Sequence, residues 1–239
     1  MTSWPRSPVE LPALEKSIHV WAVRLDDTTV DLDCGHDLLS PEERERATRF
    51  KFDRDRRRYL VAHIALHDIL SRYVPIDPAR LSFDIGANGK PRLPQALASS
   101  SVEFNLSHSN EMALLAVCHR REVGVDIEYV KEDFEFHEVA KRFFSAREVA
   151  AIRGLPANLQ RQAFFKCWTS KEAFLKAKGT GLSGALDEVK IALTTAEQVR
   201  ITADVPGWSL SELDPIDGYE GALVVANAQV PICYYLWKR

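Results

Sequence analysis

Residues 124–129 read Gly-Val-Asp-Ile-Glu-Tyr, a stretch in which Gly, Asp and Glu alternate with apolar residues and Tyr. This period of two predicts a β-strand with one face in a core and with Asp126 and Glu128 on the other face. At a rise of ~3.3 Å per residue, the Cα atoms of these two acids lie about 7 Å apart. A hard cation such as Mg²⁺ would offset the cost of two carboxylates on a half-buried strand, because oxygen ligands suit that ion. An edge strand with a solvated acidic face explains the pattern equally well, so both interpretations stay open.

The composition is that of a globular protein. The chain has 239 residues, of which 46% are hydrophobic and 27% are charged, enough for a core in one large domain or two small ones. The net charge of -3 gives no general reason to expect binding to nucleic acid or to an anionic membrane. The four cysteines are isolated and lack a zinc-binding spacing, so we expect reduced thiols. No signal-peptide pattern or membrane-length apolar segment is visible, and we expect a cytoplasmic protein.

The order of the expected elements predicts an α+β fold. Ser40 with Glu43 forms a capping box that marks a helix start, and Ser145 with Glu148 forms a second one. Apolar periodicity predicts helices at 59–74, 138–153 and 160–178, and strands at 17–26, 81–85, 102–106, 112–118, 189–193, 199–203, 208–213, 221–226 and 232–237. Helix-rich sequence is followed by strands twice, with the division near residues 110–122, which indicates two similar halves.

A basic segment lies between residues 44 and 58. It holds eight Lys or Arg residues against three acidic ones. A solvated helix face with salt bridges is the more common explanation of such a segment. The alternative is an anion site, because Arg offers two-pronged contacts to phosphate groups. The segment alone leaves both explanations open.

His63 and His67 stand one helical turn apart, which is a possible zinc-binding spacing. The zinc-protease pattern needs Glu directly after the first His, however, and Ile64 stands there. We therefore do not expect a metal at this pair.

Two further polar pairs could carry chemistry. Ser107 and His108 follow a predicted strand, where they suit either phosphate contact or a plain polar turn, and a hairpin brings them near the acidic strand. Glu172 and Lys176 are one turn apart on the longest predicted helix of the second half. Taken alone, this second pair is best explained as an ordinary helix salt bridge.

These motifs together resemble the 4'-phosphopantetheinyl transferases of the monomeric, surfactin-synthetase-activating type. In chain order they are Gly-Lys-Pro at 89–91, Phe-Asn-Leu-Ser-His-Ser at 104–109, Gly-Val-Asp-Ile-Glu at 124–128, Arg-Phe-Phe-Ser at 142–145, Trp-Thr-Ser-Lys-Glu-Ala-Phe-Leu-Lys at 168–176 and Gly-Thr-Gly-Leu-Ser at 179–183. The resemblance covers about residues 40–195, and the third and fifth motifs in this order and spacing are the most specific.

The resemblance implies two similar α/β halves related by a pseudo-twofold, with the active site at their interface. Residues 1–119 would form the half that contacts the coenzyme A phosphates, and residues 120–239 the half with the Mg-binding acids and the catalytic helix. The implied reaction is Mg²⁺-dependent transfer of the 4'-phosphopantetheine group from coenzyme A to a serine of an apo acyl or peptidyl carrier protein, with release of adenosine 3',5'-bisphosphate. Mn²⁺ is an alternative ion.

The resemblance also implies roles for single residues. Asp126, Glu128 and Glu172 match the family's metal ligands. Glu172 also matches the residue proposed as general base, with a water as the alternative, and Lys176 can stabilise charge on the transferring phosphate. The residues that match coenzyme A contacts are Arg46, Arg58, Lys90, Ser107, His108, Asp126 and Lys176.

One residue departs from the family pattern. Glu43 stands where relatives often carry a basic residue, and its charge suits the capping box but not a phosphate. Either Arg44, or Arg57 and Arg58 together, would then have to compensate in the pocket for the 3'-phosphate.

Two rival functions remain at this stage. One is a catalytically inactive module that binds coenzyme A or a carrier, and the other is a different Mg²⁺-dependent phosphohydrolase. The presence of all three acids and Lys176 argues against the first rival, and the motif order argues against the second.

The expected partners are coenzyme A and an apo carrier protein of fatty-acid, polyketide or non-ribosomal peptide synthesis. We expect a monomer without a nucleic-acid or membrane partner. Carrier docking should use exposed apolar and basic residues, and the segment after Ser145, with Val149 and Ile152, is a candidate for docking and equally for core packing.

Overall fold

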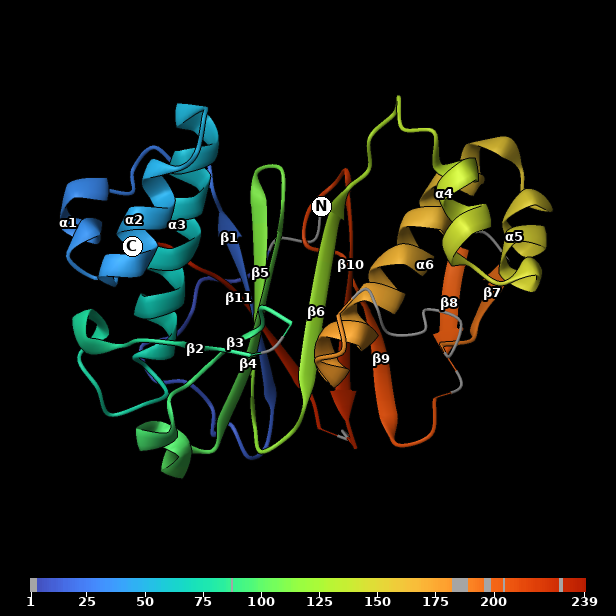
Figure 1. The fold of residues 1–239 in the computed structure, drawn as a ribbon. Coiled ribbons are helices and arrows are strands. Elements are labelled where there is room, and N and C mark those ends of the chain that lie inside the picture. Colours follow the sequence, from blue (N-terminus) through green and yellow to red (C-terminus); the bar gives the residue numbers. More distant parts are fainter. Residues whose placement is uncertain (1–3, 87, 182–188, 196–198, 204, 228–229) are drawn as a thin grey trace. The chain divides into compact units, whose positions relative to one another are not determined.

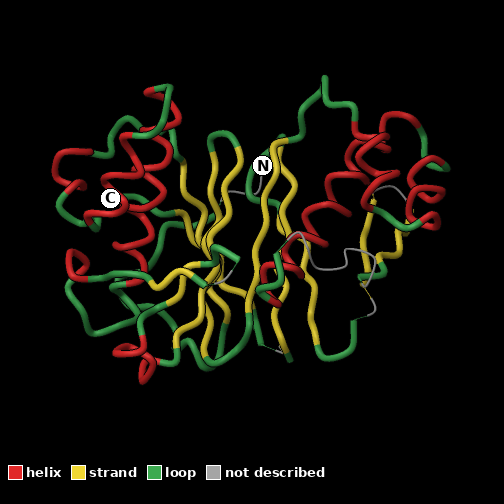
Figure 2. The backbone as a smooth tube through the Cα atoms, in the orientation of Figure 1, coloured by secondary structure: helices red, strands yellow, loops and turns green. Residues whose placement is uncertain are grey.

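Figure 1 shows the computed structural model of the chain, coloured along the sequence. It describes residues 4–86, 88–181, 189–195, 199–203, 205–227 and 230–239. These residues form two compact units, each with helices on a sheet, as the backbone trace in Figure 2 shows. The N-terminal unit comprises residues 4–120 and 230–239, and the C-terminal unit lies within residues 121–229.

The N-terminal unit is built on a sheet with the strand order β11-β1-β5-β4. Its strands are β1 (Ile18–Arg24), β4 (Val102–Ser109), β5 (Met112–His119) and β11 (Ile232–Leu236), and β11 alone runs parallel to its neighbour β1. Its helices are α1 (Leu32–His36), α2 (Pro41–Thr48) and α3 (Asp53–Leu70). The short elements between α3 and β4 are the 3-10 helices η1 (Pro78–Arg80) and η2 (Gln95–Ser100) and the hairpin of β2 (Asp84–Ile85) with β3 (Pro91–Arg92).

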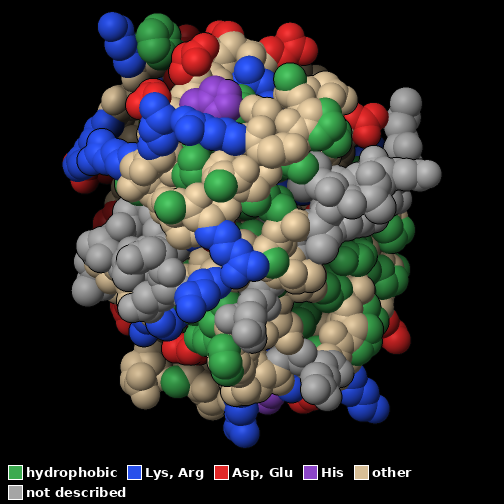
Figure 3. Space-filling model, turned by 90° about the vertical axis from the view of Figure 1, so that its right-hand side faces the viewer, with side chains coloured by type: hydrophobic (Ala, Val, Ile, Leu, Met, Phe, Trp, Pro, Cys, Tyr) green, Lys and Arg blue, Asp and Glu red, His purple; other side chains and the backbone are tan. Residues whose placement is uncertain are grey.

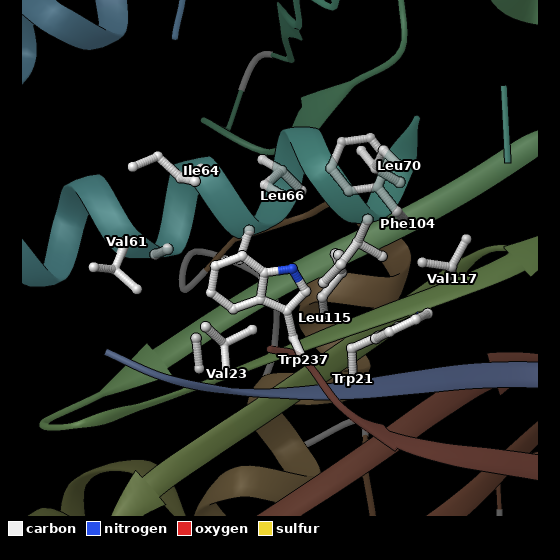
Figure 4. Packing of buried hydrophobic residues seen from close by; sticks show 14 of the residues in the cluster. Trp21, Val23, Val61, Ile64, Leu66, Leu70, Phe104, Leu115, Val117 and Trp237 are labelled. Atoms are coloured by element: carbon white, nitrogen blue, oxygen red, sulfur yellow. The ribbon is translucent and has the colours of Figure 1, made fainter. Parts of the chain in front are cut away.

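The core of this unit lies between α3 and the sheet (Figure 4). Trp21 and Leu115 of the sheet and Ile64 of α3 are almost completely buried. Trp237, just beyond β11, enters the same core and donates from its indole Nε1 to Asp68 Oδ2 at 2.7 Å. Each such apolar side chain contributes about 1.5–3 kcal/mol on burial, which fixes α3 on the sheet.

The C-terminal unit has a sheet with the strand order β6-β10-β9. Its strands are β6 (Val123–Tyr129), β9 (Trp208–Leu213) and β10 (Tyr219–Ala226), all antiparallel to their neighbours. β7 (Ile191–Thr195) and β8 (Val199–Ala203) form a separate antiparallel hairpin. Its helices are α4 (Phe136–Phe143), α5 (Ala146–Arg153) and α6 (Ala157–Lys178). Aromatic side chains join α6 to the shorter helices, with the ring of Phe164 lying 5.4 Å from that of Phe136 in α4 and 5.3 Å from that of Phe144 between α4 and α5.

The described parts of the two units repeat one order of elements. β1, α1–α3, the β2–β3 hairpin, β4 and β5 correspond in turn to β6, α4–α6, the β7–β8 hairpin, β9 and β10. The sheets repeat as well, because the last strand of each set lies between the first and the next-to-last. Both predicted capping boxes are present at corresponding helix starts, at Ser40 and Ser145. The prediction of an α+β fold with two similar halves is therefore confirmed.

Five expectations about elements differ clearly from the structure. Of the strand predicted at 81–85, only Asp84–Ile85 (β2) is a strand. The strand predicted at 102–106 continues to Ser109, because it pairs with β5 as far as Met112. The helix predicted at 138–153 is two helices, since Phe144 is extended and Ser145 caps a new start. The helix predicted at 59–74 runs from Asp53 to Leu70, where acidic residues in the first turn favour the earlier start. β11 belongs to the N-terminal sheet, although we expected all of 120–239 in the second half.

Candidate active site

Helix α6 lies against the face of β6 that carries the two acids. Gly124 permits this close approach, because a Cβ atom there would lie 1.9 Å from the carbonyl oxygen of Ala173 and 2.4 Å from the amide nitrogen of Ala177. Any other residue would push strand and helix apart. The glycine that opens the acidic motif thus seats the helix that carries Glu172 and Lys176.

Asp126 is buried beneath this helix, with only 3% of its surface exposed. Lys176 donates from Nζ to Asp126 Oδ1 at 2.6 Å. Glu128, two residues further along the same face, is half-buried. The interpretation of a solvated acidic edge is therefore wrong for Asp126, and so is the interpretation of Glu172 and Lys176 as an ordinary pair along one helix, because the Lys176 ammonium binds the strand.

Glu172 lies in an anionic environment. Burial raises the pKa of Glu172 to about 7, and the charges of Asp126 and Glu128 act in the same direction while Lys176 opposes them. Its Oε1 atom is buried and has no hydrogen-bond partner among the described residues. The single positive charge of Lys176 therefore does not balance the negative charges of the three nearby carboxylates.

These three acids fit a hard divalent cation by charge and by donor type. All their donor atoms are carboxylate oxygens, and a cation would remove the excess negative charge that raises the pKa of Glu172. Within the described residues, however, no three Asp, Glu, His or Cys side chains stand in a metal-binding arrangement. Asp126 binds Lys176 instead, so the structure brings the acids near one another without joining them at one point.

In the N-terminal unit, Ser107 and His108 lie within strand β4 and not in a loop after it. Strand geometry sends their side chains to opposite faces of the sheet, and Ser107 is buried while His108 is exposed. The turn that follows is short, and Asn110 takes a left-handed φ of 51° there. The expectation that both side chains sit in a polar loop is wrong.

Arg58 lies beside this turn. Its guanidinium donates to both carboxylate oxygens of Asp26, at 2.7 and 2.8 Å, and to Asn110 Oδ1 at 3.0 Å. The bonds to Asp26 come first among the causes that raise the pKa of Arg58, with burial opposing them. Most of its donors are therefore used within the unit.

Arg46 and Lys90 lie on other elements of the same unit. The exposed guanidinium of Arg46 stands over the ring of Tyr59, with 5.7 Å between Cζ and the ring centre. Lys90 lies in the β2–β3 hairpin after Gly89, whose φ of 80° requires glycine.

Glu43 has a structural role that the family pattern does not show. It closes the capping box of α2 through a bond from the Ser40 amide to Oε2 at 2.8 Å. The same carboxylate lies 2.6 Å from His63 Nδ1 and 2.9 Å from His67 Nε2. His63 and His67, whose spacing could suggest a zinc site, thus hold the carboxylate of Glu43. Glu43 therefore cannot serve as a phosphate contact.

The sequence analysis missed a corresponding role for Lys171 in the fifth motif. This side chain is fully buried, 3.0 Å from Glu148 Oε1, and donates to the carbonyl oxygen of Val189 at 2.8 Å. Glu148 is the capping-box residue of α5 and also accepts from the amide of Ile191 at 3.0 Å. Lys171 therefore joins α5, α6 and the start of β7, and the second capping box was the only sequence signal for it.

Comparison with known proteins gives the family. Residues 122–225 match the 4'-phosphopantetheinyl transferase superfamily, and residues 26–120 match the N-terminal family of 4'-phosphopantetheinyl transferases. The chain is 39% identical over 225 residues to the 4'-phosphopantetheinyl transferase HetI of Nostoc, which covers 94% of each chain. It is 32% identical over 198 residues to Sfp of Bacillus subtilis, covering 81% of this chain and 85% of that one.

The chain therefore belongs to the 4'-phosphopantetheinyl transferases, and the predicted family is confirmed. Among solved structures, the holo-acyl-carrier-protein synthase of Thermotoga maritima matches 45% of this chain and 64% of that chain at 23% identity, with a TM-score of 0.35. Within the part of the chain that the structure describes, no helix has the length and apolar character that crossing a bilayer requires.

Proposed function

We propose that this protein transfers the 4'-phosphopantetheine group from coenzyme A to a serine of an apo carrier protein. The serine oxygen forms the new bond to phosphorus, the pyrophosphate bond of coenzyme A breaks, and adenosine 3',5'-bisphosphate leaves. The observation that carries the proposal is the contact between the two most specific motifs, 124–128 on β6 and 168–176 on α6. Lys176 binds Asp126, and the charges of both residues act on the carboxyl group of Glu172.

We assign the divalent cation, Mg²⁺ or Mn²⁺, to Asp126, Glu128 and Glu172. When bound, it would neutralise the pyrophosphate and polarise the phosphorus under attack. Glu172 is suited to take the proton of the carrier serine, directly or through a water, because its surroundings favour proton binding. Lys176 holds Asp126 in place and supplies the cationic charge nearest to the transferring phosphate.

We assign the phosphate contacts of coenzyme A to the N-terminal unit, through Arg46, Arg58, Lys90, Ser107 and His108. The contacts within that unit rank the arginines. Arg57 donates to the carbonyl oxygens of Asp27 and Val30, at 2.7 and 3.3 Å, and so serves the fold. Arg58 can reach a phosphate only by giving up bonds to Asp26. Arg46, with Arg44 in the same helix, is therefore the first choice to replace the missing basic residue at position 43.

The carrier docks on the C-terminal unit, where helices α4 and α5 border a groove of about 680 Å³. The groove is lined by Lys141, Phe144, Ala146, Val149, Ala150, Arg153 and Gly154. Lys and Arg side chains lie among hydrophobic ones on the face seen in Figure 3. Ile152 is only 1% exposed and belongs to the core, so Val149 is the residue of the expected pair that remains suited to docking.

Mass spectrometry of an apo carrier after incubation with this protein, coenzyme A and Mg²⁺ tests the reaction. We expect the carrier to gain one phosphopantetheinyl group. Glu172→Gln and Asp126→Asn should abolish that gain while circular dichroism shows an unchanged fold. A protein that binds coenzyme A yet modifies none of several fatty-acid, polyketide and peptide carriers would be a binding module, and the proposed function would be wrong.

The docking surface has its own test. Val149→Asp should raise KM for the carrier and leave KM for coenzyme A unchanged, because the charge enters an apolar groove wall. Val9→Asp is the matched control, since Val9 is 98% exposed in the other unit and should alter neither constant. Equal effects of the two variants would exclude the groove.

A further inference from the structure

Behind the proposed active site, a second group of buried charges lies between α6 and the sheet of the C-terminal unit. Glu212 of β9 and Glu220 of β10 both face Lys166 of α6. All three side chains are at most 14% exposed. None of these three residues belongs to a motif that identifies the family, and none has a role in the proposed reaction.

The contacts of Lys166 are specific. Its Nζ lies 2.5 Å from Glu212 Oε2 and 3.1 Å from Glu220 Oε2. Gln162, one turn earlier on α6, donates to Glu220 Oε1 at 2.8 Å. Oε1 of Glu220 is thus hydrogen-bonded to α6, and Oε2, which has no hydrogen-bond partner among the described residues, forms an ion pair with Lys166 of the same helix.

The register of the sheet places Glu220 next to the proposed metal ligands. Glu220 stands directly opposite Glu128 in the antiparallel pair of β10 and β6, and Ala222 stands opposite Asp126. Directly opposed residues of such a pair have Cβ atoms about 4.5–5.5 Å apart on the same face, and like charges there repel. Without a cationic neighbour, Glu220 would be a fourth acid beside the cation site.

We propose that Lys166 is a positioning residue of the active site, which holds Glu220 and Glu212 away from the divalent cation. The proposal rests on the metal assignment made above. Lys166 keeps the number of carboxylates that face the cation at three, so that positions on the ion remain open for pyrophosphate oxygens. Loss of the ammonium turns Glu220 toward the ion, which then binds more tightly and works less well.

Metal titration of the complete protein tests this inference. Electron paramagnetic resonance measures free Mn²⁺, and thermal unfolding with and without Mg²⁺ gives a second readout. Lys166→Met should bind Mn²⁺ about tenfold more tightly than the wild type in the absence of coenzyme A, because a repelling charge is lost and an acid is gained. Its carrier modification should fall at saturating Mg²⁺.

Two further variants separate positioning from a purely structural role. Lys166→Met with Glu220→Gln removes the charge and the extra acid together, and should return the Mn²⁺ affinity to near the wild-type value. Glu220→Gln alone keeps the side-chain shape and folds without the loss of a cation. It should leave Mn²⁺ affinity unchanged, because Lys166 already holds that carboxylate away.

Three results would overturn the inference. Lys166→Met could lower the melting temperature and leave Mn²⁺ affinity unchanged, which is the result of a structural ion pair only. Glu220→Gln could weaken Mn²⁺ binding as much as Glu128→Gln does, which would make Glu220 a ligand. If the wild type binds no Mn²⁺ with or without coenzyme A, the metal assignment itself fails and the role of Lys166 fails with it.

Discussion

Gly124→Ala should disturb both the stability of the C-terminal unit and the geometry of the active site. The new methyl group would enter the backbone of α6, and none of the three atoms it meets belongs to a flexible side chain. A comfortable contact between carbon and oxygen is about 3.3 Å, whereas the ideal Cβ lies 1.9 Å from Ala173, so helix and strand must separate by about 1.4 Å.

Two magnitudes follow from this displacement. Overpacking of a close-packed interior costs about 1–3 kcal/mol, and a backbone clash belongs at the upper end. Lys176 and Glu172 belong to the displaced helix, so their distances to Asp126 change by about as much as the helix moves. Misplacement of catalytic groups by about 1 Å costs on the order of 100-fold in rate. We expect a loss of about 3 kcal/mol in the free energy of unfolding and a roughly 100-fold slower transfer.

Urea denaturation and the rate of carrier modification measure the two effects. Gly154→Ala is the matched control for the stability measurement in the same unit, because its new Cβ would lie an ordinary 3.4 Å from the carbonyl oxygen of Ala150 at a normal negative φ. This control should change stability by no more than about 0.5 kcal/mol. If Gly124→Ala keeps the wild-type denaturation midpoint and rate, close contact between β6 and α6 does not position the site.

Buried charges give three more expected outcomes. Lys171→Met leaves Glu148 buried without its cation and should lower the free energy of unfolding by about 3–5 kcal/mol in urea titrations; a change below 1 kcal/mol would contradict the buried pair. Burial opposes ionisation of Glu43, but hydrogen bonds from its two histidines hold its pKa well below the usual range. Its stabilising effect should therefore be complete at neutral pH and be lost on acidification, and Glu43→Gln should cost about 2 kcal/mol at pH 7 with a flatter acid limb in calorimetry. For Glu172, burial raises the pKa to about 7, so the folded protein without metal binds this proton more tightly than the unfolded chain. The contribution of Glu172 to stability is then greatest below about pH 4.5 and declines by at most about 3 kcal/mol as the pH rises to 7, a slope that Glu172→Gln or added Mg²⁺ should remove.

The elements that could be predicted from sequence are those that local interactions decide. Each capping box needs only a serine and a glutamate three residues apart, and both form as expected. β6 could be recognised from its alternation, and the end of α6 from Gly179, which takes a φ of 70°. The interactions that determine these elements lie within one helical turn or one strand.

Long-range pairing explains most of the differences. The parallel pairing of β11 with β1 joins residues from opposite ends of the chain, and nothing local to 232–236 selects that partner. Arg58 looked like a phosphate ligand in the basic segment, but its bonds to Asp26 depend on how β1 and α3 pack. Nothing in the sequence indicated a role for Glu212 or Glu220, and only the sheet register places them against Lys166.

The two units show why one copy of this scaffold can hold charges that the other lacks. On β1, Trp21 and Val23 face α3 within the apolar core (Figure 4). On the corresponding strand β6, Asp126 and Glu128 take that place against α6. The first layer is stabilised chiefly by burial of apolar surface, whereas the second depends on lysines of α6 and, in our proposal, on a cation. The C-terminal unit compensates with aromatic packing, where Phe144, Phe164 and Trp168 lie together. Trp168 stands one turn before Glu172 on the same face of α6, so the aromatic packing that fixes the helix directly adjoins the residues that carry the chemistry.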